Sequence, residues 1–215
     1  MILPRSWLTP RSRGPILTLG LALALALLFV PACKKVRRTD TRALDQAGMW
    51  FNKIEELRQM EITDAEVADL AKARQSGVSD AGCLELMRLA RARKLPFASG
   101  DAIAKLRRVD VSEAAILELA RLDQLGLWVG EAQAMRLAGF SDEVILAVAR
   151  RRAAGKPVLS GPSLTQLKNA GWSEADLLSF IDRGTTDEQA AQMVAAHQRA
   201  ITPSGFTRQR GRRPR

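Results

Sequence analysis

An internal repeat constrains the fold of this chain more than any other feature of its sequence. Four segments share one pattern without gaps: an apolar residue, serine, an acidic residue, two variable positions, two apolar positions, a variable position and two more apolar positions. The segments are residues 78–88, 111–121, 140–150 and 172–182, and their starts lie 33, 29 and 32 residues apart. A helical hairpin of this length cannot bury its own apolar face, so such units stack against one another.

The first residues of each segment are those that begin an α-helix. The serine side chain accepts a hydrogen bond from a free N–H group of the first turn, and the acid beside it favours the positive end of the helix dipole. The apolar residue before the serine stands where a hydrophobic staple fixes the entry of the chain into the helix. The remaining apolar positions recur at helical spacing, which predicts one buried stripe per helix.

A second, shorter helix is expected before each segment, because apolar residues three positions apart precede all of them. These pairs are Val67 and Leu70, Ile103 and Leu106, Ala132 and Met135, and Leu164 and Leu167. Capping-box patterns mark two further helix starts, Thr63 with Glu66 and Thr186 with Gln189. The sequence therefore predicts an all-α fold of four tandem helix-turn-helix repeats of about 30 residues, which form a small solenoid or a compact helical bundle. One helix near residues 42–60 precedes the repeats, and another near 186–200 follows them.

Composition and charge divide the chain into four parts. Aromatic residues make up only 5% of it, which argues against a β-sandwich or barrel. The net charge is +10, yet residues 39–207 hold all 23 acidic residues and 21 of the 33 Lys and Arg. The positive charge therefore lies on two arms, before residue 39 and after residue 207, and this distribution gives little support to a basic DNA-reading face. The predicted parts are a signal peptide (1–32), a basic membrane-proximal linker (33–41), an α-helical repeat domain (42–200) and a disordered Arg-rich tail (201–215).

The N-terminal segment has the organisation of a secretory signal peptide. A basic stretch without acids, residues 1–13, precedes an uncharged apolar run at residues 16–30. That run is short for a helix across the ~30 Å hydrocarbon core of a bilayer. It ends in Val30-Pro31-Ala32-Cys33, which resembles the lipobox of bacterial lipoproteins, where an aliphatic residue and a small residue precede the cysteine. Pro31 departs from that pattern.

The lipobox resemblance implies that Cys33 is acylated with a lipid such as palmitate, that residues 1–32 are removed, and that a membrane of the cell envelope anchors the mature chain. Lys34 follows the cysteine in place of the aspartate that marks inner-membrane retention in enteric bacteria, which implies the outer membrane. The resemblance covers the first 33 residues and implies nothing about the body. Two alternatives stay open: ordinary secretion, and an uncleaved single-pass anchor formed by the uncharged residues 14–33.

The two basic arms are candidate anion-binding segments. Cations beside a membrane attract anionic headgroups, and an Arg-rich tail of low apolar content binds polyanions through charge alone. The alternatives are a solvated linker and a solubilising tail. The candidate residues are Lys34, Lys35, Arg37 and Arg38 in the linker and Arg208, Arg210, Arg212, Arg213 and Arg215 in the tail.

Residues for catalysis or metal binding are few. With one His, and with Cys83 as the single Cys of the body, no metal cluster or Cys/His dyad is expected. Cys83 occupies an apolar slot of the repeat and is interpreted as a buried structural thiol rather than a nucleophile. His197 has no His or Cys partner at helical spacing, so a surface or capping role is expected. Residues 150–152, all Arg, end a helix, where complementing the dipole is favoured over an anion site. We therefore expect no enzymatic activity, no cofactor and no metal.

Three tryptophans of the body complete the candidate residues. Trp172 stands in a staple position and is expected in the core. Trp50 and Trp128 lie at the ends of elements and are candidate partly exposed anchors of a partner interface, although core packing is favoured for both. The chain is thus expected to be a membrane-anchored extracytoplasmic lipoprotein whose repeats form a non-catalytic protein-interaction or structural module, bound to another envelope protein and to no small-molecule substrate. The alternative is a polyanion-binding envelope protein that uses the two basic arms.

Overall fold

The computed structural model describes residues 39–126 and 128–201, and these residues form helices without any strand, which confirms the all-α prediction. The described helices are α2 (Arg42–Gln46), α3 (Phe51–Gln59), α4 (Asp64–Gln75), α5 (Asp80–Ala92), α6 (Gly100–Arg108), α7 (Glu113–Arg121), α8 (Val129–Leu137), α9 (Asp142–Ala153), α10 (Gly161–Asn169), α11 (Glu174–Arg183) and α12 (Asp187–Ile201). The predicted signal peptide and Cys33 lie outside the described residues, as do the basic residues of both arms.

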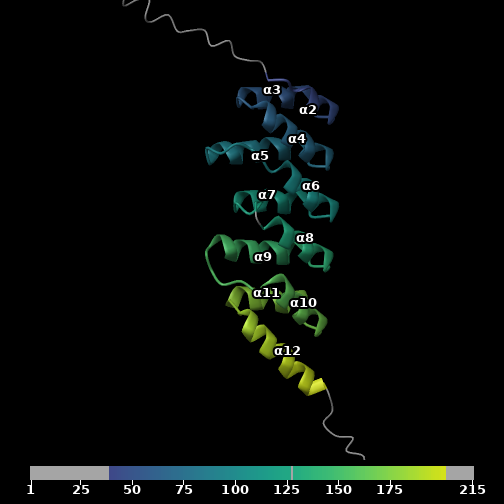
Figure 1. Ribbon diagram of the computed structural model, residues 1–215, viewed down its shortest axis with the longest axis vertical. Coiled ribbons are helices and arrows are strands. Elements are labelled where there is room, and N and C mark those ends of the chain that lie inside the picture. Colours follow the sequence, from purple (N-terminus) through teal and green to yellow (C-terminus); the bar gives the residue numbers. More distant parts are fainter. Residues whose placement is uncertain (1–38, 127, 202–215) are drawn as a thin grey trace, which may run out of the picture. The chain divides into compact units, whose positions relative to one another are not determined.

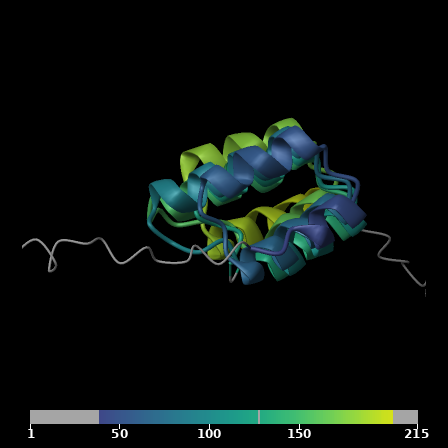
Figure 2. The ribbon, with the colours of Figure 1, turned by 90° about the horizontal axis from the view of Figure 1, so that it is seen from above.

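The helices form hairpins that stack in two rows (Figures 1 and 2). The first row holds α2, α4, α6, α8, α10 and α12, and the second row holds α3, α5, α7, α9 and α11. Each described helix of a hairpin contacts its partner and its neighbours in the same row, and α12 contacts α10 alone among the described helices. We number the hairpins as units one to five, from α2–α3 to α10–α11. This is the arrangement of a solenoid, in which every unit buries its apolar faces against the units beside it.

The expectation of a single helix near residues 42–60 is wrong, because this segment forms the hairpin α2–α3. Gly48 adopts a positive φ of 77° between the two helices, a conformation that glycine reaches without steric cost. Met49 follows it and is 3% exposed, in the staple position of the other units. The array therefore contains five hairpins among the described residues. The helix expected near 186–200 is present as α12 and packs against α10 in the first row.

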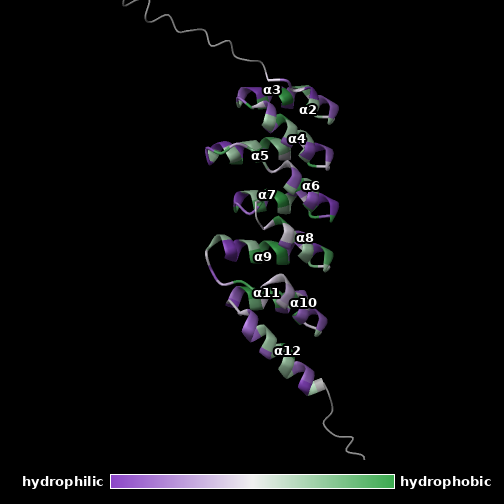
Figure 3. Cartoon of the chain, viewed as in Figure 1, coloured by the Kyte–Doolittle hydropathy of each residue, from purple (hydrophilic) through white to green (hydrophobic). Residues whose placement is uncertain are grey.

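Apolar residues of the repeat form one continuous core along the stack. The first apolar slot inside each repeated segment is completely buried and holds Cys83, Ile116, Ile145 and Leu177. In Figure 3, hydrophobic stretches lie within the stack and hydrophilic residues lie at the outer helix ends. The serines that precede α5, α7, α9 and α11 each accept a hydrogen bond from a backbone N–H of the first turn, as their pattern predicts. The sequence repeat thus determines both where helices begin and which side of each is buried.

Candidate binding surfaces

The acids at the start of α5, α7, α9 and α11 each bind the preceding unit. Each carboxylate accepts a hydrogen bond from the backbone N–H of the N-cap residue one unit earlier, with N···O distances of 2.8 to 3.1 Å. The pairs are Trp50 with Asp80, Ser79 with Glu113, Ser112 with Asp142, and Ser141 with Glu174. We call these four carboxylates the acidic ladder. The helix-dipole explanation of the acids missed this second role, because the partner lies one whole unit away in the sequence.

The acidic ladder ends inside the last unit. No sixth second-row helix follows among the described residues, and the backbone N–H of Ser173 instead donates to Asp176 of its own helix at 3.0 Å. Ser173 and Asp176 form a capping box there. At the other end, Phe51 occupies the acid position of unit one, which has no preceding described unit to bind.

A second set of contacts joins the first row to the preceding turns. Basic side chains near the ends of α4, α6, α8 and α10 donate hydrogen bonds to backbone carbonyls of the turn one unit earlier. They are Arg74 to Gly48, Arg107 to Ser76, Arg136 to Val109 and Lys168 to Gly139. We call these residues the basic ladder. Together the two ladders satisfy backbone groups that the turns would otherwise leave exposed to water.

Glu66 is a buried carboxylate, only 1% exposed, that joins three segments of the chain. It accepts hydrogen bonds from both terminal nitrogens of Arg91, at 2.6 and 2.8 Å, and from the backbone N–H groups of Thr63 and Phe97, at 2.9 and 3.1 Å. Burial alone raises the pKa of Glu66, but these hydrogen bonds outweigh it and lower the pKa from 4.5 to about 2. The capping-box pattern predicted only the contact with Thr63. The contact with Arg91 joins the two helices of unit two, and the contact with Phe97 fixes the loop that leads to unit three.

The three consecutive arginines at the end of α9 contact protein groups. Arg150 lies 3.4 Å from a carboxylate oxygen of Glu118, and Arg152 lies 3.3 Å from one of Glu131. Arg151 donates to the backbone carbonyl of Asp182 at 2.9 Å. Because all three guanidinium groups have intramolecular partners, their position supports a structural role.

Cys83 is completely buried, as its place in the repeat predicts. Burial raises the pKa of its thiol to about 12. The thiolate, which is the reactive form, is therefore almost absent near neutral pH.

We expect Cys83 in the folded chain to resist alkylation by N-ethylmaleimide at about pH 8, because roughly one thiol in ten thousand is then ionised and the sulfur has no solvent access. After denaturation in urea the same thiol should be modified completely. Intact-mass spectrometry measures both states. Rapid modification of the folded chain at Cys83 would contradict the buried position.

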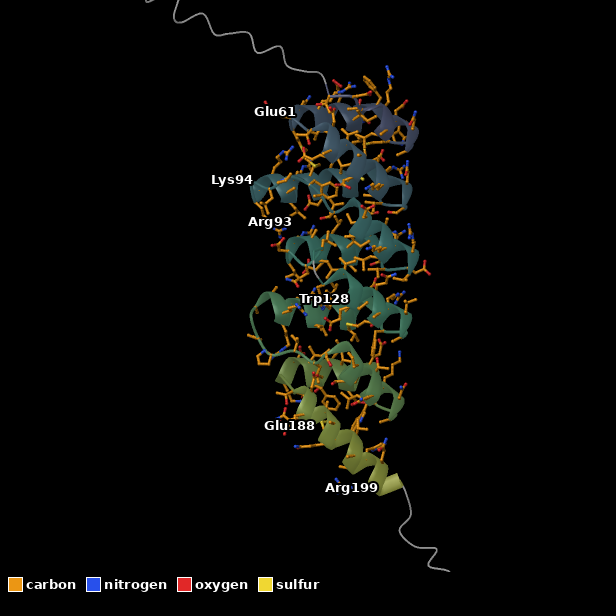
Figure 4. All side chains as sticks on the ribbon, in the orientation of Figure 1. Glu61, Arg93, Lys94, Trp128, Glu188 and Arg199 are labelled. Atoms are coloured by element: carbon orange, nitrogen blue, oxygen red, sulfur yellow. The ribbon has the colours of Figure 1, made fainter. Side chains whose placement is uncertain are left out.

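Of the two tryptophans proposed as interface anchors, one is buried and one is exposed. Trp128 is 3% exposed, so it packs in the core, as favoured from the sequence, and is not the exposed interface anchor that was the other candidate role. The apolar segment before α8 folds onto the core, with Leu125 and Val129 also buried, and Figure 4 labels Trp128 within the stack. Trp50 is 75% exposed and its neighbour Phe51 73%, at the start of α3. These two residues, which we call the aromatic pair, form an exposed apolar surface on unit one.

Trp172 closes the core near the other end of the array. Its ring meets that of Phe180 edge-on, with ring centres 5.3 Å apart, and His197 of α12 lies at the same distance from it. His197 thus packs on an aromatic ring. Within residues 39–126 and 128–201, no group of three or more His, Cys, Asp or Glu side chains is placed to hold a metal ion.

A groove lies between units two and three, where the loop after α5 approaches the segment after α7. Its cavity of about 180 Å³ is lined mainly by apolar side chains, among them Leu89, Phe97 and Leu125. Leu95 lines the same groove and is 53% exposed. An ion pair between Arg93 and Asp123, at 3.2 Å, adds a polar rim. An apolar centre with a polar rim is the usual composition of a protein-binding site.

The described helices include none that is both long enough and apolar enough to cross a bilayer. Comparison of the chain with models of protein families, with curated proteins and with solved structures finds no match. The proposals for its function therefore rest on its own residues and their geometry.

Proposed function

We propose that the chain is a lipid-anchored protein of the bacterial cell envelope whose helical array binds another envelope protein and catalyses no reaction. The observation that carries the binding role is the groove between units two and three. It holds exposed and half-buried apolar side chains beside a cavity of about 180 Å³. A cavity of about 150 Å³ takes up a benzene molecule, so this groove has room for one apolar side chain of a partner protein.

Support for the anchor comes from the sequence before the array. Val30, Ala32 and Cys33 match the lipobox pattern, which places the acylated residue six positions before Thr39, the first described residue. Lys34 favours the outer membrane within this proposal. An uncleaved single-pass anchor is the alternative.

Binding of polyanions is the weaker proposal for the array. Residues 39–201 hold 21 Lys and Arg against 23 Asp and Glu. Many of these cations already contact protein groups, as the basic ladder and Arg91 show. A polyanion would therefore have to bind the basic arms outside the described residues.

Intact-mass spectrometry of the membrane fraction tests the anchor. The wild-type chain should begin at Cys33 and carry added acyl mass, and the Cys33→Ala variant should lack that species. If residues 1–32 are retained in both samples, the lipid anchor is contradicted and a transmembrane anchor is indicated.

A photo-crosslinking amino acid placed at Leu95 tests the groove in intact membranes. The matched control is Leu137, which is 72% exposed and does not line the groove. We expect one protein to be crosslinked from position 95 and not from 137, and to be lost when Leu89→Glu places a charge in the groove. Purified partner should then bind the wild-type array at least tenfold more tightly than the Leu89→Glu variant, with unchanged helix content in both. Identical crosslinks from both positions would contradict a specific site.

A further inference from the structure

The aromatic pair occupies positions that hold helix-starting residues in every other unit. Trp50 stands at the N-cap position of α3, where the corresponding residues before α5, α7, α9 and α11 are serines. Phe51 stands where those helices carry an acid. The Trp50 side chain makes no capping hydrogen bond, whereas all four serines do. Two aromatic residues therefore replace residues that would start the helix better, and both are exposed.

The backbone beneath the aromatic pair is firmly held. The Trp50 N–H donates to Asp80 at 3.0 Å, and Asp80 lies 2.6 Å from the Nε atom of Arg74. Ile54 and Leu57 of the same helix are buried in the core. The exposed rings are thus presented by a fixed part of unit one.

Unit one is also the part of the described chain nearest in sequence to Cys33. Five residues separate Cys33 from Thr39, and four of them are Lys or Arg. Thr39 is bound to the array, because its hydroxyl donates to the carbonyl of Ile62 at 2.7 Å. Six residue steps span at most about 20 Å, so an acylated Cys33 keeps Thr39 within that distance of the bilayer.

We propose that the aromatic pair inserts into the headgroup region of the anionic bilayer that carries the anchor. This inference rests on the membrane anchoring of the proposed function. Tryptophan favours the membrane–water interface, because its ring is apolar and its N–H is polar. The four cations of residues 34–38 draw the same end of the chain towards anionic headgroups. An acylated Cys33 would keep the bilayer within reach of unit one.

Quenching of tryptophan fluorescence by brominated lipids tests the proposal. The full chain, processed by the cell and purified, is reconstituted into vesicles of equal parts phosphatidylglycerol and phosphatidylcholine with bromine near the headgroup. Every sample carries Trp7→Phe, so the remaining tryptophans are Trp50, Trp128 and Trp172. Because Trp128 is buried and Trp172 is half-buried in the array, quenching should come from Trp50.

We expect several-fold stronger quenching in this sample than in the Trp50→Phe variant, and unchanged quenching in Trp172→Phe. Phe51→Ala should weaken the quenching of Trp50 without changing the helix content. Equal quenching with and without Trp50 would overturn the proposal. It would indicate that the aromatic pair binds a protein partner instead of the bilayer.

Intact mass of the same samples separates this proposal from the anchor. An uncleaved chain with quenched Trp50 would refute acylation and still support insertion, since residues 14–33 would then hold unit one at the bilayer. An acylated chain with unquenched Trp50 would overturn insertion alone. A chain with neither acyl mass nor residues 14–33 would overturn both the membrane anchoring and the insertion of the aromatic pair.

Discussion

Replacing Glu66 by alanine is expected to lower the free energy of unfolding by about 3 kcal/mol, because one buried and one partly buried backbone N–H group and the partly exposed guanidinium of Arg91 lose their acceptor together. Arg91 would lose both of its contacts, at 2.6 and 2.8 Å, and the N–H groups of Thr63 and Phe97 would lose their acceptor. Urea denaturation of the detergent-solubilised chain, followed by far-ultraviolet circular dichroism, measures the change. Glu188→Ala is the control, since Glu188 also lies in a first helical turn but is exposed. It should change stability by less than about 0.5 kcal/mol, and equal losses in both variants would contradict the role of Glu66.

The same carboxylate predicts a dependence on pH. The pKa of Glu66 falls from 4.5 to about 2 on folding, so its contribution is complete above the unfolded value and is lost as the pH falls from there towards the folded value. The shift corresponds to about 3 kcal/mol. Glu66→Gln takes up no proton at this site, so the stability difference between wild type and this variant should shrink by that amount between about pH 5 and about pH 2. A difference that stays constant over this range would contradict the lowered pKa.

Removal of one carboxylate of the acidic ladder gives the second large expected effect. Glu113→Ala should lower the free energy of unfolding by about 1–2 kcal/mol more than Glu143→Ala, because a charge-assisted hydrogen bond between units is lost. Glu113 accepts from the backbone N–H and the hydroxyl of Ser79, at 2.8 and 2.5 Å. Glu143 is exposed in the first turn of α9, so the two variants lose similar interactions with a helix dipole. The urea denaturation described above provides the comparison.

Hydrogen exchange locates the effect of Glu113→Ala along the array. The amide of Ser79 should exchange faster in this variant, whereas the amide of Ser112, which is bound to Asp142, should keep its protection. Equal stability losses in Glu113→Ala and Glu143→Ala, with unchanged exchange at Ser79, would mean that the helix dipole alone accounts for the acid.

The sequence predicted the units that carry the full repeat pattern and missed the one that does not. Serine, acid and apolar spacing located α5, α7, α9 and α11, because each signal acts within one helix. Unit one lacked the signal, since Trp50 and Phe51 replace the serine and the acid, although Gly48 and Met49 retain the turn. Its hairpin depends on packing against α4 and α5 rather than on its own helix-starting residues.

The contacts between residues far apart in the sequence could not be predicted from it. The capping box of Thr63 and Glu66 is local, but its contacts with Arg91 and Phe97 depend on how α5 and the following loop fold back over α4. The exposure of Trp50 and Trp128 could not be decided from the sequence for a similar reason, because it depends on the path of the chain at the start of each helix. Trp50 is exposed although packing was favoured for it, and its part in an interface stays a prediction.

The acidic ladder joins the same two positions, an N-cap N–H group and the first acid of the next second-row helix, at each junction from unit one to unit five, and Asp176 closes it within α11. Duplication or deletion of the gene segment for one interior unit would therefore leave compatible donors and acceptors on both sides of the new junction. Neighbouring packed helices lie about 10 Å apart, so each such event would lengthen or shorten the array by about that distance. The length of the helical array can thus change in evolution by whole units, while the residues that end the array stay the same.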